Sequence, residues 1–325
     1  MSSSISNSDP FRLFARAMGA GALVGVLLLL AARFGPNASR VDYMGALGPK
    51  HARLNALPSP KVVLIGGSNA TFGFNSRTIE ETLCRPVVNM SIHANLGFRF
   101  MVDEVKASFG EGDLVIAALE YSAYHEPIKF NDIHLLALDR NVALLKFLDP
   151  IDRPRALLGV AVLRLQAIWK VLGGAWKDHS PDKVYRANGF NVQGDLISHL
   201  SLPPFPLGDQ ERVRAYHPPI SPDIWPIVLE LNDSLERHHG TLVFTWPSMA
   251  RSSADTATNN AILRALVEHG QHIVGDADDH IFADSAFYDT QNHLRSAGRQ
   301  VRTNALLLDL CASGLVHCCI PSGSP

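Results

Sequence analysis

A serine that follows a short apolar run is the first residue in this sequence that could carry chemistry. Residues 62–65 are apolar and mostly β-branched, Gly66 and Gly67 interrupt them, and Ser68 comes directly afterwards. This pattern predicts a buried strand that ends in a tight turn, because glycine accepts backbone angles that other residues resist. A serine on such a turn is held by the scaffold while its hydroxyl faces a substrate. The alternative is a strand and a turn without chemistry.

A second stretch, near the C-terminal end, supplies an acid and a base. Asp289 and His293 lie four residues apart in the stretch FYDTQNHL. Ester hydrolysis and acyl transfer need a nucleophile, a base and a group that orients the base. We therefore predict that Ser68 attacks, that His293 is the base and that Asp289 orients it. Asp284 is the reserve acid, and the alternative for His293 is a surface histidine that caps a helix.

A serine after the first strand, combined with a late Asp–His pair, resembles the SGNH/GDSL hydrolase superfamily. The match is with its membrane-anchored branch of DltD-like and alginate O-acetylation-like proteins, and it spans residues 61–310. The resemblance implies a three-layer α/β/α domain around a mostly parallel sheet of about five strands, and an ester hydrolase or O-acetyltransferase without a cofactor. In the superfamily the acid usually precedes the histidine by three residues, whereas this branch often has the spacing of Asp289 and His293.

The resemblance also assigns the groups that would stabilise an oxyanion. Backbone N–H groups and an amide side chain usually have this role. The backbone N–H of Ser68 is one expected donor. Ser91 stands where the superfamily has a glycine after its second strand, and its backbone N–H is the second expected donor. Asn69, next to the nucleophile, is the expected amide.

Four further residues are predicted to contact the substrate. The superfamily has an asparagine after its third strand, but Glu120 and Tyr121 stand there in this chain. An ionised glutamate cannot donate a hydrogen bond, so we expect a structural or substrate-binding role for Glu120. His93 and Asn95 are close to Ser91 in the sequence and are predicted to line the same pocket. Asn95 is also an alternative amide donor to the oxyanion.

The composition limits the kinds of protein that this chain can be. With 46% hydrophobic residues among 325, it can bury the core of one large domain or of two small ones. The formal net charge is −2 and no basic block occurs, which argues against nucleic acid as a partner. The cysteines are Cys84, Cys311, Cys318 and Cys319. Their spacing contains no Cys-x-x-Cys zinc pattern, and the sequence leaves their disulfide pairing open.

The N-terminal segment predicts a membrane anchor. Residues 1–12 are polar and expected to be disordered. An uncharged run then lies between Arg16 and Arg33, whose side chains can reach the two interfaces, and it predicts a transmembrane helix over residues 13–34. A cleaved signal peptide is the alternative. A short N-terminus before a first apolar helix usually stays in the cytoplasm, so we expect a single-pass protein of the inner (cell) membrane, with its globular domain on the periplasmic or extracellular side.

The rest of the chain alternates strands and helices, which is the pattern of a parallel sheet covered on both faces. Residues 35–60 contain prolines and small residues and are expected to be a linker. The α/β domain is predicted over residues 61–312, with a helical insertion at about 130–220 and a flexible tail over 313–325. The predicted strands are 62–66, 87–90, 113–119, 241–246 and 271–274.

Two stretches of the insertion have distinct patterns. Residues 154–176 are strongly apolar, but Arg164 and Lys170 interrupt them, and charges are costly at the centre of a bilayer. We expect a buried or amphipathic helix, as part of a lid, and the alternative is a helix on the membrane surface. Residues 188–200 predict a turn-rich loop, in which Asp195 and His199 are too few ligands for a metal site. The membrane-anchored branch has a similar Asn-x-x-Gly-Asp stretch, which implies a loop near the substrate.

The predicted function is that of a membrane-anchored serine esterase or O-acyltransferase. Its substrates would be acyl esters, acetyl esters above all, of an extracytoplasmic glycan, because proteins of the resembled branch modify exported polysaccharides. Hydrolysis and transfer share an acyl-enzyme, so the sequence leaves both open. The alternative is an inactive scaffold or assembly subunit of an envelope polysaccharide system, which the missing superfamily asparagine favours. The expected partners are the membrane, the glycan and other polysaccharide-modification proteins of the envelope.

Overall fold

The computed structural model describes residues 10–125, 128–177, 179–204 and 220–319. Its centre is a five-stranded sheet in which every neighbouring pair is parallel, in the order β2-β1-β3-β4-β6. The strands are β1 (Val62–Gly66), β2 (Val87–Asn89), β3 (Leu114–Ala118), β4 (Thr241–Thr245) and β6 (Ile273–Val274). The predicted α/β class and parallel sheet are confirmed, and each strand lies within its predicted range.

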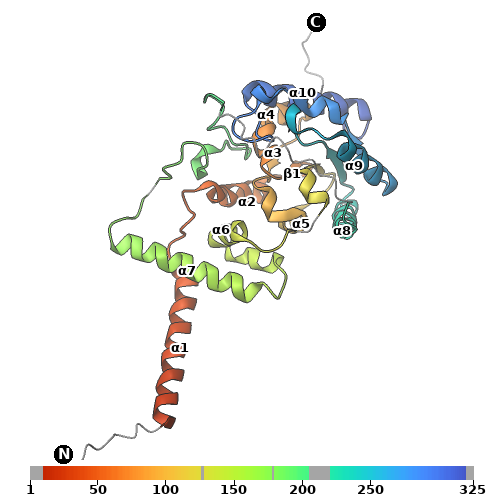
Figure 1. The fold of residues 1–325 in the computed structure, drawn as a ribbon. Coiled ribbons are helices and arrows are strands. Elements are labelled where there is room, and N and C mark those ends of the chain that lie inside the picture. The colour runs from red at the N-terminus through yellow and green to blue at the C-terminus, as the bar shows by residue number, and fades with distance from the viewer. Residues whose placement is uncertain (1–9, 126–127, 178, 205–219, 320–325) are drawn as a thin grey trace, which may run out of the picture.

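Helices cover both faces of this sheet, because the side chains of each strand alternate between two cores (Figure 1). In β1, Val63 and Ile65 belong to one core, and Val62 and Leu64 belong to the other. The first core is covered by α5 (Gly97–Val105), α8 (Ile224–Glu236) and α9 (Thr256–Glu268). The second is covered by α3 (Ser68–Gly73), α4 (Ser76–Leu83) and α10 (Ser296–Ser313). The result is the expected three-layer arrangement.

A third core joins the helical insertion to the α/β domain. The insertion contains α6 (Asp132–Arg140) and α7 (Arg153–Leu172), inside the range expected for it. Leu138 of α6 and Val160 of α7 are buried in this core together with Phe72 of α3. The insertion therefore packs directly on the helix that follows β1.

Helix α1 (Pro10–Phe34) projects away from the domain (Figure 1). Its segment Phe11–Ala31 has a mean hydropathy of 2.1 and is long and apolar enough to cross a membrane. The predicted apolar helix over residues 13–34 is thus present, and it begins three residues earlier, at Pro10. Residues 1–9 of the segment that was expected to be disordered lie outside the described residues.

The segment 35–60 is not a linker. It contains helix α2 (Leu47–Ala56), which buries Leu47 and Leu54 against the domain. Pro49 lies in the first turn of α2, where the missing N–H of a proline costs no helical hydrogen bond. Gly48 and Pro49, which are among the residues that suggested a linker, therefore lie in the first turn of a helix.

The C-terminal tail is fixed to the domain as far as it is described. Leu315 and Val316 pack against the second core. The disulfides are Cys84–Cys319 and Cys311–Cys318. The expected flexible tail over residues 313–325 is therefore wrong for residues 313–319, since apolar contacts and two disulfides hold them, and residues 320–325 lie outside the described part of the chain.

Candidate active site

Ser68 begins helix α3 directly after β1, at the carboxyl edge of the sheet. A Cβ atom on Gly66 would lie 2.3 Å from the carbonyl oxygen of Ala118. A Cβ atom on Gly67 would lie 2.2 Å from a carboxylate oxygen of Glu120. Position 66 therefore requires glycine, because the neighbour is backbone, and a side chain at position 67 would displace the Glu120 carboxylate. Ser68 is half-buried and lines a cavity of about 620 Å³.

The loop that carries the acid and the base folds back on itself. Phe287 and Leu294 form an isolated antiparallel bridge, and the N–H of Tyr288 donates to the carbonyl of His293 at 2.8 Å. This closure brings the side chains together, so that a carboxylate oxygen of Asp289 lies 2.7 Å from Nδ1 of His293. The four-residue spacing of the acid and the base therefore gives a direct contact.

The electrostatics of this pair favour an ionised acid. Burial alone would raise the pKa of Asp289, but the hydrogen bond and charge of His293, together with the hydroxyl of Tyr185, outweigh burial and hold that pKa below its ordinary value. Asp289 is therefore a carboxylate at neutral pH. A carboxylate beside Nδ1 of His293 keeps a proton on that nitrogen, which leaves Nε2 unprotonated in the neutral ring.

Two residues that the sequence analysis did not find hold the same pair. The hydroxyl of Tyr185 donates to the second carboxylate oxygen of Asp289 at 2.5 Å and lies 3.2 Å from Nδ1 of His293. Phe72 stacks on the His293 ring, with centroids 3.8 Å apart and planes at 6°. Burial and the neighbouring carboxylate raise the pKa of Tyr185, so its hydroxyl keeps its proton. Tyr185 lies in the insertion, and an apolar residue such as Phe72 is indistinguishable in sequence from a core residue.

The cavity brings three of the predicted site residues together: Ser68, His93 and His293. Aromatic, aliphatic and polar side chains complete its wall, namely Asp42, Tyr43, Met44, Ile133, Leu136, Tyr185, Thr290, Gln291 and Asn292. Asp289 lies behind His293 as its hydrogen-bond partner. Neither the Ser68 hydroxyl nor Nε2 of His293 has a hydrogen-bond partner among the described residues, so both are available to a ligand in the cavity.

His93 presents a hydrogen-bond donor to this cavity. Its Nδ1 accepts the backbone N–H of Asn95 at 3.1 Å. Burial, and to a smaller extent the charge of His293, lower the pKa of His93, so the ring is neutral. Since Nδ1 is an acceptor, the single ring proton is on Nε2.

Glu120 and Asn69 secure the turn after β1 and do not line the cavity. The Glu120 carboxylate accepts the backbone N–H groups of Gly67 and Asn69, each at 3.0 Å. The Asn69 side chain donates to the Ala118 carbonyl at 2.9 Å and accepts from Arg302 at 2.8 Å. Contrary to the prediction, Asn69 is therefore not free to stabilise an oxyanion. Glu120 thus has the structural role, which is one of the two that were expected for it.

Three other predicted residues do not line the cavity. The backbone N–H of Ser91 donates to the Asn89 side chain at 3.1 Å, so it is not free for an oxyanion, contrary to the prediction. Tyr121 is buried in the first core, which α5, α8 and α9 cover, and this removes it from a substrate-binding role. Asn95 is exposed and reaches the cavity only through the N–H that it gives to His93. Their positions after strands were predicted correctly, but their side chains and N–H groups face other partners.

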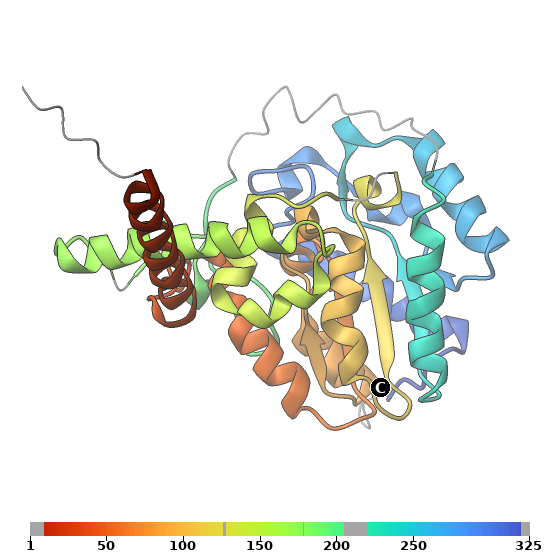
Figure 2. The same ribbon diagram turned by 90° about the horizontal axis from the view of Figure 1, so that it is seen from below.

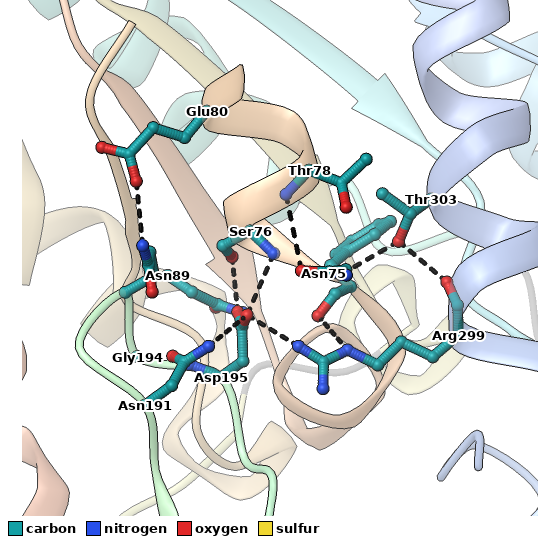
Figure 3. A network of polar contacts seen from close by, with 12 residues as sticks. Asn75, Ser76, Thr78, Glu80, Asn89, Asn191, Gly194, Asp195, Arg299 and Thr303 are labelled. Atoms are coloured by element: carbon teal, nitrogen blue, oxygen red, sulfur yellow. Dashed lines mark hydrogen bonds and ion pairs between the residues drawn. The ribbon is translucent and has the colours of Figure 1, made fainter. Parts of the chain in front are cut away.

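The loop over residues 188–200 connects neighbouring elements through a network of hydrogen bonds (Figure 3). None of its residues lines the cavity. Its centre is Asp195, which is fully buried. The carboxylate accepts hydrogen bonds from Ser76, Asn89, Asn191 and Arg299. Since these partners include the start of α4, the end of β2 and α10, the loop joins three elements. The implied place near the substrate is thus not observed.

His199 of the same loop packs on Phe72, the residue that stacks on His293. Its Nε2 lies 2.9 Å from the carbonyl of Leu294, and its ring packs on Phe72 with centroids 4.6 Å apart. Burial lowers the pKa of His199 to about 4, so this ring is neutral. In the part of the chain that the structure describes, no three histidine, cysteine or acidic side chains are grouped to hold a metal ion.

No model of a known protein family matches the chain, and no curated protein matches it. The resemblance to the SGNH/GDSL superfamily therefore rests on Ser68, Asp289 and His293 and on the elements that carry them. The activity has to be inferred from the chemistry of the cavity.

Proposed function

We propose that the protein is a membrane-anchored serine esterase or O-acyltransferase that acts on acyl esters of an extracytoplasmic glycan. One observation carries the proposal: Ser68 and His293, from opposite ends of the domain, line one cavity, and Asp289 holds Nδ1 of that histidine at 2.7 Å. A nucleophile, a base and an acid that orients the base are the parts that acyl transfer needs.

The reaction follows from the protonation states of these groups. Asp289 keeps the proton on Nδ1 of His293, so Nε2 takes the proton of Ser68 as its oxygen attacks the acyl carbonyl carbon. The tetrahedral intermediate then collapses, and His293 gives this proton to the leaving alcohol. Water or a second hydroxyl group attacks the acyl-serine, which gives hydrolysis or transfer. Hydrogen bonds of this kind often form only when the substrate is bound, in keeping with the unpartnered Ser68 hydroxyl.

One donor that the resemblance assigned to the oxyanion, the backbone N–H of Ser68, is kept, and His93 takes the place of the other two. The backbone N–H of Ser68 has no partner among the described residues. His93, whose ring proton is on Nε2, lines the same cavity. We assign this pair to the oxyanion, because both groups belong to residues that line the cavity. Removal of one such donor typically costs about 10²–10³-fold in rate.

The disulfides support an extracytoplasmic location of the domain, and the cavity wall supports a sugar as the substrate. Disulfides persist in oxidising compartments, and all four cysteines of the chain are paired. Helix α1 would then cross the inner (cell) membrane once, with the domain on its periplasmic or extracellular side. The cavity is lined by Tyr43 and Tyr185 and by Gln291 and Asn292, and such a mixture of aromatic and hydrogen-bonding side chains suits a sugar ring.

A non-catalytic scaffold or assembly subunit of an envelope polysaccharide system is the second candidate. The contacts of Glu120 favour it, because this carboxylate occupies two backbone N–H groups beside Ser68. Such a protein would keep the fold and bind other polysaccharide-modification proteins without an activated serine.

Ester turnover by the full chain in detergent separates the two candidates. The substrates are p-nitrophenyl acetate and an acetylated glycan, and the variant is Ser68→Ala. Ser285→Ala, in an exposed residue, is the matched control. The proposal predicts that Ser68→Ala loses nearly all turnover while Ser285→Ala keeps it. Equal turnover by Ser68→Ala and the wild type would leave the scaffold as the standing candidate.

A further inference from the structure

Helix α7 carries an apolar stripe that no part of the described chain covers. One side of the helix is buried against the domain through Ala156, Val160, Arg164 and Ala167. The opposite side exposes apolar side chains, whose exposed fractions are 53% for Leu158, 42% for Val162, 71% for Trp169 and 72% for Leu172. Spacings of four, seven and three residues place these side chains on one face of the helix. A continuous apolar face of this kind marks an interaction surface.

The position of α7 relative to α1 indicates what covers the stripe. Helix α7 crosses the end of α1 that joins the domain, and α1 projects from there away from the sheet (Figures 1 and 2). The crossing is close, because a Cβ atom on Gly35 would lie 2.8 Å from Cβ of Arg164. Arg164 is fixed in turn by Asp139, whose carboxylate accepts from Nε at 3.0 Å. The two helices therefore keep a defined arrangement.

This arrangement sets the level of the membrane surface. The apolar segment of α1 ends at Ala31, and the crossing lies one helical turn later, at Gly35. If α1 spans a bilayer, the bilayer surface lies at the height of α7. The buried side of α7 faces α6 and the domain, so its exposed stripe faces the side to which α1 projects (Figure 1).

We propose that α7 lies in the interface of the bilayer that α1 spans, with its stripe of Leu158, Val162, Trp169 and Leu172 immersed at the boundary between headgroups and acyl chains. Amphipathic helices bind membranes in this way. The inference needs only the anchoring by α1 and goes beyond the proposed activity, because it holds whether or not Ser68 is a nucleophile.

Charge and residue type agree with a lipid interface. Lys170 is exposed next to Trp169, and a long basic side chain can lie along an apolar surface while its charge reaches lipid phosphates. Trp169 is the tryptophan of the stripe and is 71% exposed. Tryptophan is enriched where membrane and water meet. The exposed Arg33 near the end of α1 adds a further positive charge at the same level.

Two attachments would hold the domain in one orientation. Helix α6 packs on α7, and its residues Ile133 and Leu136 form part of the cavity wall. With α1 as the only contact, the domain could rotate about its anchor. With α7 in the interface, the cavity stays at a fixed height above the lipid.

Quenching of tryptophan by brominated lipid tests this directly. The full chain is placed in nanodiscs of phosphatidylcholine and phosphatidylglycerol, in which the phosphatidylcholine carries bromine at a shallow or at a deep acyl position. The four tryptophans of the chain are Trp169, Trp176, Trp225 and Trp246. We expect shallow bromine to quench more than deep bromine, and Trp169→Phe to lose most of the quenching. Trp225→Phe is the matched control, because Trp225 stacks on His269 at 3.6 Å, on another side of the domain, and should keep it.

Unchanged quenching in Trp169→Phe, with an unchanged circular dichroism spectrum, would overturn the inference. A dimer in the nanodisc with unquenched Trp169 would also overturn it, since a second copy would then cover the stripe. Carbonate extraction of cell membranes that contain the full chain reports on α1 alone. A protein that resists extraction but shows no quenching contradicts the placement of α7 only, whereas one that is quenched but turns over no ester contradicts the proposed activity only.

Discussion

The proposed base is held by side chains from three separate parts of the chain. Asp289 contacts Nδ1 of His293 from the same loop, Tyr185 reaches this pair from the insertion, and Phe72 stacks on the ring from α3. Each contact restricts a different motion of the imidazole. Loss of any one of them should therefore change the pH dependence of the reaction or its rate before it changes the fold.

Removal of the Tyr185 hydroxyl tests this arrangement. In Tyr185→Phe the ring stays, but Asp289 loses a donor, so the pKa of its carboxyl rises toward the ordinary value. Because Asp289 then binds its proton at higher pH, the acidic limb of the kcat/KM profile moves to higher pH. One hydrogen bond to a charged group is worth about 1.5–3 kcal/mol, so we expect a loss of about 10-fold or more in kcat. Tyr288→Phe is the control, and an unchanged pH profile in Tyr185→Phe would contradict the assignment.

His93 is predicted to stabilise the oxyanion through Nε2–H. His93→Ala should lower kcat by about 10²–10³-fold and leave KM nearly unchanged, because the contact forms only as negative charge develops. His93→Gln should restore part of the rate, since its amide can donate. His272→Ala, in an exposed histidine, is the control. A rise in KM without a fall in kcat would assign His93 to ground-state binding of the substrate.

At the scale of elements, Asp195 decides how the loop over residues 188–200 is attached. In Asp195→Asn one side-chain oxygen becomes a donor that faces other donors, and buried Arg299 loses its carboxylate partner at 2.7 Å. Breaking a buried ion pair in this way costs about 3–5 kcal/mol. Urea unfolding should show this loss, whereas Asp233→Asn, in an exposed residue of α8, should change little. Equal stability of the two variants would show that the side-chain contacts of Asp195 do not stabilise the fold.

The sequence predicted those elements whose signals are local. Each strand of the sheet is a short apolar run, and the closed loop of Asp289 and His293 lies within a few residues. Two of the three predicted oxyanion donors were wrong, because the Asn69 amide donates to the carbonyl of Ala118, 49 residues away, and the N–H of Ser91 donates to the Asn89 side chain. Helix α2 was missed, since a glycine and a proline in a first turn look like a linker in sequence. Contacts between distant segments leave no pattern in a single sequence.

At the scale of the whole molecule, two buried histidines make stability depend on pH. Burial lowers the pKa of His199 to about 4 and that of His280 to about 3, from 6.5 in an ordinary histidine. As pH falls through 6.5, the unfolded chain binds protons that the folded chain does not, so the free energy of unfolding decreases.

We expect a loss of about 3–5 kcal/mol between about pH 6.5 and pH 4.5, measured by urea unfolding in a series of buffers. His199→Gln should flatten the slope in this window, and the exposed His272→Gln should not. A stability that stays constant or rises toward acid would contradict the neutral, buried state of these rings.

The central claim is that Ser68 is an activated nucleophile, and fluorophosphonate labelling of the full chain in its membrane tests it most directly. Such a probe reacts with a serine whose hydroxyl is deprotonated by a neighbouring base. We expect mass spectrometry of the labelled protein to find one adduct, on Ser68, which is lost in Ser68→Ala and His293→Ala and kept in Ser285→Ala. A folded wild-type protein that remains unlabelled, or that carries its adduct on another serine, would contradict the account.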